Sequence, residues 1–429
     1  MAKSSRLVCI VICSAIAFMS LWLYFSITTL KTIIQDIQID GTVPINTPPS
    51  PDSINYNENN NNINSQNLDV NKLHSHYTIP SLTEVTNPND PFANSHTSKR
   101  NFSVNCPYKP IKNYPLETSM KEILNNWPAD DTNIPSFHYD SLCHFNYQDD
   151  NDKKKIMNYQ VAEVPYIVYN YPPSDKTVIE WSDLNYLKSK IGDYEQNTEL
   201  SDSNHFMYYR IPKKMKPSLR ATWKPPTTKT LMTFKDFLEH GLNQHNISLN
   251  NRKHAYLRIS ARSPEKSKEN LNYWLYQDMP WFNPPKKQDN IVMRGYQKSR
   301  GIHCRFGMKA VTAETHFDGS RNAIFQIRGM RRWIIVAPKH CNAMYLYAQG
   351  HPSSRHSRIN WSAPDYQQFP LFAHAGAIEI VMQPGDLLYL PTFWMHFIVS
   401  LNMNAQCNSR SGVDFDKDRA NLKKCGFYS

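Results

Sequence analysis

The chain has 429 residues, long enough for one large domain or two ordinary ones, and 40% of them are hydrophobic, which is sufficient for a folded core. Only 13 residues are glycine, which argues against Gly-rich nucleotide-binding folds and collagen-like repeats. The formal net charge is +11, but Lys and Arg are scattered along the chain, so we expect no nucleic-acid partner.

Residues 7–30, LVCIVICSAIAFMSLWLYFSITTL, contain no charged side chain. At helical rise this stretch crosses a hydrocarbon core of about 30 Å, so we expect a transmembrane helix. The alternative is a cleaved signal peptide, but that would have a shorter apolar stretch and a clear small-residue cleavage site. Because Lys3 and Arg6 precede the span, the positive-inside bias predicts a type II signal-anchor, with residues 1–6 in the cytosol and the rest in the lumen of the endoplasmic reticulum or Golgi.

Six cysteines lie outside this span, an even number that is compatible with disulfides in an oxidising compartment. They are Cys106, Cys143, Cys304, Cys341, Cys407 and Cys425. Their pairing cannot be deduced from the sequence. Three glycosylation sequons, which begin at Asn101, Asn246 and Asn360, agree with a luminal location but add little, because such short motifs arise by chance.

Residues 31–100 are rich in Asn, Ser, Pro and Asp and poor in large apolar side chains. Such a composition cannot bury a core, so we expect a disordered, Asn-rich stalk. Ordered patterning begins near Phe102, and we therefore place a single catalytic domain at residues 101–429.

The first half of this domain predicts helices and one strand. A short helix is expected over residues 118–126, stopped before Pro128, and a strand over residues 161–172. Ser182 is expected to cap the next helix, and Gly192 to end it.

A further helix is expected to begin at Thr233. Thr233 and Asp236 form a pair that resembles a capping box, ahead of Phe237 and Leu238.

After this point the hydrophobic period shifts from 3.6 toward 2. The short segments are rich in β-branched and aromatic residues and are separated by Gly, Pro or Asp. They are HAYLRIS, IHCRFGMKAV, AIFQIRG, RRWIIVAP, IEIVMQPG and DLLYLP. Many short strands with turn signals predict a mainly β domain with flanking helices, here a jelly roll, also called a double-stranded β-helix.

A metal-binding pattern lies on these strands. In THFDGSRN, His316 and Asp318 are separated by one residue, so both can point into the interior while Phe317 points away. A third ligand is assigned to His396, in PGDLLYLPTFWMHF. Two histidines and one carboxylate form the triad of non-haem Fe(II) oxygenases, which leaves positions free for cosubstrate and O₂.

The His-x-Asp spacing is not specific by itself, because the chain contains 16 histidines and a second triplet occurs at His138-Tyr139-Asp140. A single histidine is more often a structural or surface residue than a ligand. Only the sequence downstream of His316 distinguishes it from His138. Asn322, Gln326, Gly329 and Arg331 follow His316 in the sequence, and the Pro-Gly-Asp turn and Trp394-x-His396 come later.

The run THFDGSRNAIFQIRGMRRWIIVAP, followed by PGDLLYLPTFWMHFIVSL, resembles the cupin-like branch of the JmjC oxygenases, of the type of the asparaginyl hydroxylase that acts on hypoxia-inducible factor. The resemblance covers residues 164–412. It implies a dioxygenase that uses Fe(II) and 2-oxoglutarate.

The resemblance also implies a set of 2-oxoglutarate contacts. Arg331 matches the cation that binds the distal carboxylate, where a Lys is commoner, and Tyr256 matches a tyrosine that helps to hold it. Asn322 and Asn408 match amides that line the cosubstrate pocket. The alternatives are a solvated charge for Arg331, a core aromatic for Tyr256 and a turn role for Asn408.

Alternation in the strand places Arg331 and Trp333 on one face and Arg332 on the other.

The sequence departs from the family at two positions. Ala313 replaces a Thr or Ser three residues before the first ligand, which removes a hydroxyl contact to the carboxylate. Arg410 stands where relatives carry an aromatic residue.

We expect a hydroxylase of protein side chains, with a protein or peptide substrate chosen by loops near Trp281-Phe282 and by the region before Tyr256. Two alternatives remain, a JmjC-type lysine demethylase and a catalytically inactive cupin that serves as a binding module.

Overall fold

The computed structural model describes residues 106–245, 247, 251–262, 271–414 and 416–427. The expected membrane span at residues 7–30 and the expected stalk at residues 31–100 lie outside the described residues. Among the helices that are described, none is both long and apolar enough to cross a bilayer.

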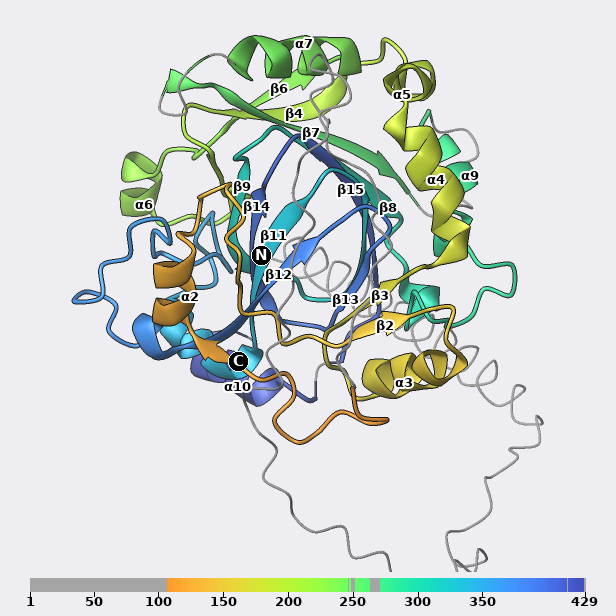
Figure 1. Ribbon diagram of the computed structural model, residues 1–429. Helices are drawn as coiled ribbons and strands as arrows, with labels where there is room; N and C mark the ends of the chain where they lie inside the picture. The colour runs from red at the N-terminus through yellow and green to blue at the C-terminus, as the bar shows by residue number, and fades with distance from the viewer. Residues whose placement is uncertain (1–105, 246, 248–250, 263–270, 415, 428–429) are drawn as a thin grey trace, which may run out of the picture. The chain divides into compact units, whose positions relative to one another are not determined.

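Two β-sheets, whose strands are mainly antiparallel, form the centre of the domain (Figure 1). In spatial order, the six-stranded sheet contains β1 (Thr118–Ser119), β12 (Gly376–Met382), β11 (Arg331–Val336), β14 (Met395–Ser400), β9 (Thr312–Phe317) and β5 (His205–Phe206). In the same way, the nine-stranded sheet contains β2 (His144–Asn146), β3 (Tyr166–Tyr169), β13 (Leu387–Leu390), β10 (Arg321–Arg328), β15 (Asn404–Ser411), β8 (Ile302–Gly307), β7 (His254–Ala261), β4 (Gln196–Ser201) and β6 (Thr228–Met232). The prediction of mainly β structure is confirmed, and the arrangement is consistent with a jelly roll.

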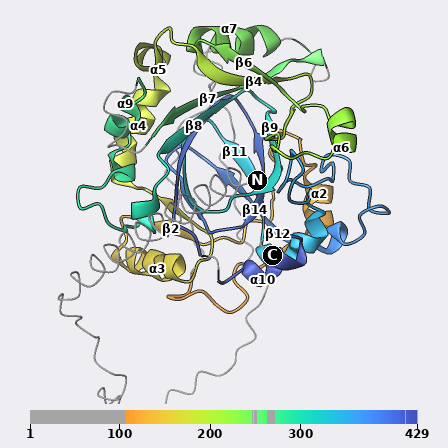
Figure 2. The ribbon, with the colours of Figure 1, turned by 180° about the vertical axis from the view of Figure 1, so that it is seen from behind.

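Helices lie around these sheets, as the two opposite views show (Figures 1 and 2). The α-helices are α2 (Met120–Asn126), α3 (Asp150–Val161), α4 (Pro172–Ser182), α5 (Leu184–Ile191), α6 (Pro217–Thr222), α7 (Phe234–His245), α9 (Trp274–Asp278) and α10 (Arg419–Lys424). Short 3₁₀ turns are η4 (Pro280–Phe282), η5 (Tyr296–Lys298), η6 (Pro338–Met344) and η7 (Phe372–His374). The helix α4 packs on β10 and α7 packs on β7, so both cover the nine-stranded sheet.

Strict alternation of side chains along β11 and β14 decides what points between the sheets. Trp333 and Ile335 pack with residues of the opposite sheet, such as Leu388, in one apolar cluster. Ile334 packs in a separate cluster with residues of α2 and η7. The same alternation places Ile398 of β14 in the cluster between the sheets, so His396, two residues earlier, faces the same interior.

Two expectations about local structure near α4 need correction. The strand expected over residues 161–172 is only β3, because α3 extends to Val161 and Pro172 begins α4. Ser182 does not cap α5, since α4 extends through it. The cap is Asp183, whose carboxylate accepts a hydrogen bond of 2.8 Å from the backbone N–H of Asn185. A carboxylate directly before the first helical turn is well placed to take an unpaired N–H there.

Capping at the other two expected helices follows the sequence closely. The helix expected over residues 118–126 begins at Met120, with Ser119 and Glu122 forming a capping box. At α7, the Thr233 hydroxyl accepts a hydrogen bond of 3.1 Å from the backbone N–H of Asp236, as expected.

The six cysteines outside the expected span form three disulfides, in agreement with their even number. The pairs are Cys106–Cys143, Cys304–Cys407 and Cys341–Cys425. The second pair joins β8 and β15 at residues that face each other directly across the ladder. Such pairing is typical of proteins that fold in an oxidising compartment.

Candidate metal centre

The three histidine and aspartate residues expected to bind iron come together because β9 and β14 are neighbours. His316 of β9 pairs directly with His396 of β14. Asp318 follows β9 immediately, two residues after His316, and therefore points to the same side. Phe317, between them, points away and packs against Phe427 with a ring-centroid distance of 5.2 Å.

The donor atoms of His316, Asp318 and His396 lie within 4.8 Å of one another, a spacing that one metal ion can bridge. The Nδ1 atom of His316 lies 2.8 Å from the carbonyl oxygen of Glu314, and that of His396 lies 3.1 Å from the carbonyl oxygen of Trp394. An Nδ1–H that donates to a carbonyl leaves Nε2 as the free acceptor. The hydrogen bonds therefore assign both rings the tautomer that a metal ligand requires.

The electrostatic surroundings keep both imidazoles neutral. Burial lowers the pKa of His316 well below the usual histidine range, and the neighbouring His396 and His356 rings lower it further. Burial also lowers the pKa of His396, and the charge of Asp318 only partly opposes this effect. Neutral imidazole is the form that binds a metal, so neither ring has to lose a proton first.

Asp318 is held as a carboxylate by its partners. Its Oδ2 atom accepts a hydrogen bond of 3.3 Å from the Asn322 amide and lies 3.0 Å from Nη2 of Arg410. Burial alone would raise the pKa of Asp318, but the charge of Arg410 lowers it far below the usual range. These two partners occupy one carboxylate oxygen and leave the other for a cation.

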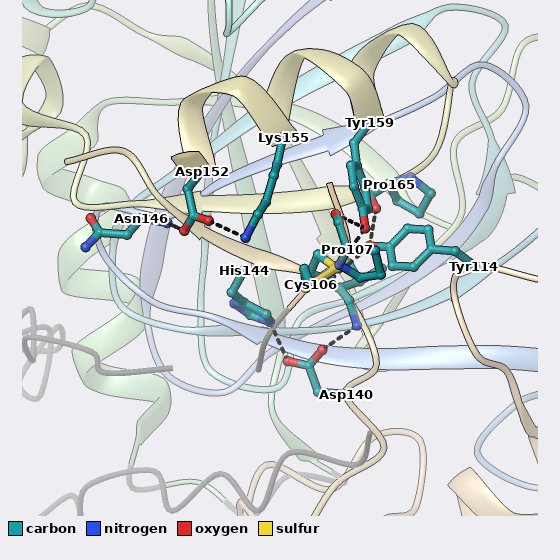
Figure 3. The surroundings of a disulfide bond; sticks show 12 residues. Cys106, Pro107, Tyr114, Asp140, His144, Asn146, Asp152, Lys155, Tyr159 and Pro165 are labelled. Carbon is teal, nitrogen blue, oxygen red and sulfur yellow. Dashed lines mark hydrogen bonds and ion pairs between the residues drawn. A yellow bond between two sulfur atoms is a disulfide. The ribbon is translucent and has the colours of Figure 1, made fainter. Parts of the chain in front are cut away.

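The competing triplet at His138 and Asp140 has a structural role. The Asp140 carboxylate lies 2.8 Å from Nε2 of His144 and accepts a 3.0 Å hydrogen bond from the backbone N–H of Leu142, beside the Cys106–Cys143 disulfide (Figure 3). His138 is buried against Trp127. Among the residues that the structure describes, the cluster that could hold a metal is the one at His316.

Arg331 is buried, with 1% of its surface exposed. Its Nη1 donates to the Gln406 side-chain oxygen at 3.0 Å and to the Tyr256 hydroxyl at 3.3 Å, and its Nε donates to Asn404. Its buried Nη2 has no hydrogen-bond partner among the described residues. A buried guanidinium with a free N–H and no carboxylate partner is suited to an anionic ligand.

Arg332 points to the opposite face, as strand alternation predicts. Its guanidinium forms a fork on Glu379, at 3.0 Å and 2.7 Å, and lies 4.0 Å from the centre of the Trp127 ring. Both charged side chains are fully buried. Removing Arg332 would leave a buried carboxylate unpaired, so this residue has a structural role and is unsuitable as a neutral control.

A cavity of about 250 Å³ opens over His316, Asp318 and His396. Of the four residues expected at 2-oxoglutarate, Tyr256, Asn322 and Asn408 line it, whereas Arg331 does not. Asn408 is on β15, not in a turn, and its amide donates to the Asn322 oxygen at 2.8 Å. Ala313 also lines the cavity, so a methyl group stands where the family resemblance predicts a hydroxyl.

Several cavity residues have positions or roles that sequence reasoning did not assign. Arg258, Arg305 and His356 line the cavity, and so does Arg410, which had been noted only as a departure from the family. Arg258 could have been found, because it lies two residues after Tyr256 on the same strand and shares its face. His356 had no signal, since it reaches His316 through a long loop and stacks on it with a ring-centroid distance of 5.1 Å.

The structure does not place Trp281 and Phe282, near which a substrate-selecting loop was expected, at the site. Both rings are buried in the main apolar core and pack against Phe325 of β10. Neither residue lines the cavity.

Comparison with known proteins gives one family. The family described as "Cupin-like domain" matches residues 153–409, close to the range of 164–412 expected from the sequence. JmjC domain-containing protein D of Dictyostelium discoideum is 23% identical over 238 residues, which cover 52% of this chain and 46% of the relative. HSPB1-associated protein 1 of Rattus norvegicus is 26% identical over 207 residues, 44% of this chain and 40% of the relative.

A third relative matches over a shorter stretch. The tRNA wybutosine-synthesizing protein 5 of Homo sapiens is 33% identical over 86 residues, 20% of this chain and 26% of the relative. The chain spans less than half of the length of each of these three proteins.

Proposed function

Because the chain belongs to the cupin-like, JmjC-related family, we propose that it is an Fe(II)- and 2-oxoglutarate-dependent dioxygenase. The observation that carries the proposal is the convergence of His316, Asp318 and His396, two neutral imidazoles and one carboxylate whose donor atoms lie within 4.8 Å. This donor set suits Fe(II).

The side chains fit both groups. Iron can bind the Nε2 atoms of His316 and His396 and one oxygen of Asp318. The Nδ1 atoms of both rings and the other oxygen of Asp318 are already engaged by protein partners. For 2-oxoglutarate, we assign the distal carboxylate to Arg331 and Tyr256. The unpaired Nη2 of Arg331 supports this assignment, since a buried N–H without an acceptor is costly. Asn322 and Asn408 would line the path between the carboxylate and the metal.

When bound, iron and 2-oxoglutarate supply the oxidation of a substrate C–H bond by O₂. The chain itself binds, orients and shields. The carbonyl groups of Glu314 and Trp394 fix the two imidazoles, and Arg410 and Asn322 fix the Asp318 carboxylate. Trp333 forms one wall of the cavity, with its ring centroid 5.5 Å from that of His396, and excludes water from that side.

We propose that the substrate is a protein side chain that becomes hydroxylated. The name of HSPB1-associated protein 1 links one relative to a protein partner, whereas that of the tRNA wybutosine-synthesizing protein links another to RNA. A lysine demethylase and an inactive binding module stay as alternatives. A measurement of 2-oxoglutarate turnover directly tests the inactive module.

The test is conversion of 2-oxoglutarate to succinate by the purified full-length protein without added substrate, measured by mass spectrometry. We expect succinate to form only with Fe(II) and to stop when a chelator is added. A protein that binds iron yet forms no succinate under these conditions would be an inactive cupin, and the proposal would be withdrawn.

A further inference from the structure

The cavity over the metal site carries more positive charge than the proposed iron and 2-oxoglutarate account for. Four arginines line it, whereas Asp318 is the one carboxylate that does so. Arg258 lies 3.1 Å from Glu199 and Arg410 lies 3.0 Å from Asp318. Arg305 and Arg355 have no carboxylate partner in the described part of the chain. Iron and 2-oxoglutarate carry opposite charges of equal size, so their binding would leave this excess unchanged.

Of Arg305 and Arg355, Arg305 gives the stronger argument for an anionic ligand. It is on β8, directly opposite Arg258 of β7, and its Nη1 contacts a backbone carbonyl at 3.2 Å. Burial, together with the charges of Arg258, Arg410 and Arg331, lowers its pKa to about 9, but the guanidinium stays protonated at neutral pH. Arg305 is half-buried, and a partly desolvated cation among other cations is costly unless a ligand neutralises it.

A second concentration of charge lies outside the cavity. Residues 210–229 contain seven Lys or Arg and no Asp or Glu, a local excess that the scattered distribution along the whole chain conceals. All seven are exposed, and none forms an ion pair within the described residues. The segment includes α6, which lies on the same side of the domain as β9 in both views (Figures 1 and 2).

The two charged regions are continuous. An outer hollow of about 590 Å³ is lined by Arg210 and Lys213 on one side and by residues 349–352, 354 and 355 on the other. Tyr208 and Arg355 line both this hollow and the cavity over the metal site. The backbone of Arg355 has a φ of +77°, which is strained for a residue other than glycine and persists only where the surrounding structure enforces it.

Resting on the proposed function, we propose that the substrate is an acidic segment of a polypeptide. Arg305 would receive a carboxylate close to the oxidised carbon, and the basic segment at residues 210–229 would bind flanking acidic side chains along the outer hollow.

Two observations favour a polypeptide over another polyanion. The three disulfides favour an oxidising compartment, where nucleic acid is not an expected partner. In addition, β6 is the outermost strand of the nine-stranded sheet and ends the basic segment, so its free edge can hydrogen-bond an extended peptide backbone. Lys229 of β6 pairs across the ladder with Glu199, and Glu199 pairs with Tyr256, so these side chains share the sheet face that leads to the cavity.

The first experiment measures binding of a fluorescein-labelled peptide of alternating Glu and Ser, twelve residues long, to the full-length protein by fluorescence anisotropy at an ionic strength of about 0.05 M. The same peptide with Gln in place of Glu is the neutral probe. We expect only the acidic peptide to bind. Replacing Lys213, Lys214 and Lys216 with Gln should weaken binding about tenfold, as expected for three exposed charges. The matched control replaces Lys109, Lys112 and Lys154, three exposed lysines on or near α3, and should change nothing.

A second variant separates the cavity from the outer hollow. Arg305→Gln should weaken binding of the acidic peptide by a larger factor than it raises the Michaelis constant for 2-oxoglutarate. If it instead raises that constant while peptide binding stays intact, Arg305 belongs to the cosubstrate site and its assignment here is overturned. Equal binding of both peptides, or tighter binding of a twelve-nucleotide single-stranded DNA, would also overturn the proposal.

Peptide binding requires no turnover, so the two proposals can fail separately. Binding of the acidic peptide without iron-dependent succinate would leave the acidic-peptide site in place but remove the proposed oxygenase, and with it the role of the peptide as a substrate. Succinate formation without selective peptide binding would support the proposed oxygenase and overturn the acidic-peptide site.

Discussion

Each proposed iron ligand has a distinct partner that orients it, the Glu314 carbonyl for His316, the Trp394 carbonyl for His396 and Arg410 for Asp318. We therefore predict that His316→Ala, Asp318→Ala and His396→Ala each reduce iron-dependent succinate formation by at least about 100-fold, because the loss of a ligand exceeds the effect of losing a supporting partner. Iron content, measured on the purified variants by inductively coupled plasma spectrometry, should fall in parallel.

The matched control for these variants is His138→Ala. His138 belongs to the other His-x-Asp triplet and is buried with 3% of its surface exposed, so its removal should lower the melting temperature while activity per folded molecule persists. Loss of iron in the His138 variant, with retention in the His316 variant, would show that the metal site has been assigned to the wrong triplet.

The guanidinium of Arg331 gives a second prediction at the level of single residues. Arg331→Ala should raise the Michaelis constant for 2-oxoglutarate about tenfold or more, as expected for losing a charge-assisted hydrogen bond of roughly 1.5 to 3 kcal/mol. Arg331→Lys should restore most of the affinity, because a cation remains at the same depth.

Arg419→Ala, an exposed arginine of α10, replaces the unsuitable Arg332 as the control. Unfolding curves of all three variants are needed, because Arg331 also binds Asn404 and Gln406. An unchanged Michaelis constant in folded Arg331→Ala would move the carboxylate site elsewhere, with Arg305 the next candidate.

At the level of secondary structure elements, β8 and β15 are joined both by backbone hydrogen bonds and by the Cys304–Cys407 disulfide. These cysteines are 103 residues apart in the sequence, against 37 for Cys106–Cys143. Closing a longer loop restricts the unfolded chain more. We predict that replacing both Cys304 and Cys407 with Ala lowers the free energy of unfolding by about 2 to 4 kcal/mol, and that the Cys106 and Cys143 double variant loses about 1 kcal/mol less.

Chemical denaturation of the three proteins under oxidising conditions provides the comparison. If both double variants unfold at the same denaturant concentration as the unmodified protein, the disulfides do not stabilise the native fold.

For the whole molecule, we propose a type II membrane protein with its catalytic domain in the lumen. The basis is the uncharged stretch at residues 7–30 preceded by Lys3 and Arg6, and the three disulfides agree with it. We predict that the full-length chain stays in the membrane fraction after carbonate washing and that residues 102–429 resist protease in sealed vesicles. Digestion of this region before detergent is added would reverse the topology, and release by carbonate would remove the anchor.

Local periodicity was enough to determine much of the strand pattern and the inward direction of His316, Asp318, His396 and Arg331. Side chains alternate along a strand whatever the rest of the chain does, so a run such as RRWIIV assigns each residue to a face by itself. Helix caps were predicted where one candidate stood alone, as at Thr233. They were missed where Ser182 and Asp183 were adjacent, because the end of the preceding helix decides between them.

What only the tertiary structure decided depends on residues far apart in the sequence. The second His-x-Asp triplet has the same spacing as the first, but Asp140 pairs with His144, and the donor atoms there do not form a cluster that could hold a metal. Arg410 could be noted from the sequence as unusual, but its ion pair with Asp318 joins residues 92 positions apart. Arg305 reaches the site through the order of the strands, and His356 reaches it through a returning loop. Alternation along a strand specifies which face of the sheet a side chain occupies. The pairing of distant strands specifies which other side chains it contacts on that face, and at this site that pairing determines the charge of the cavity.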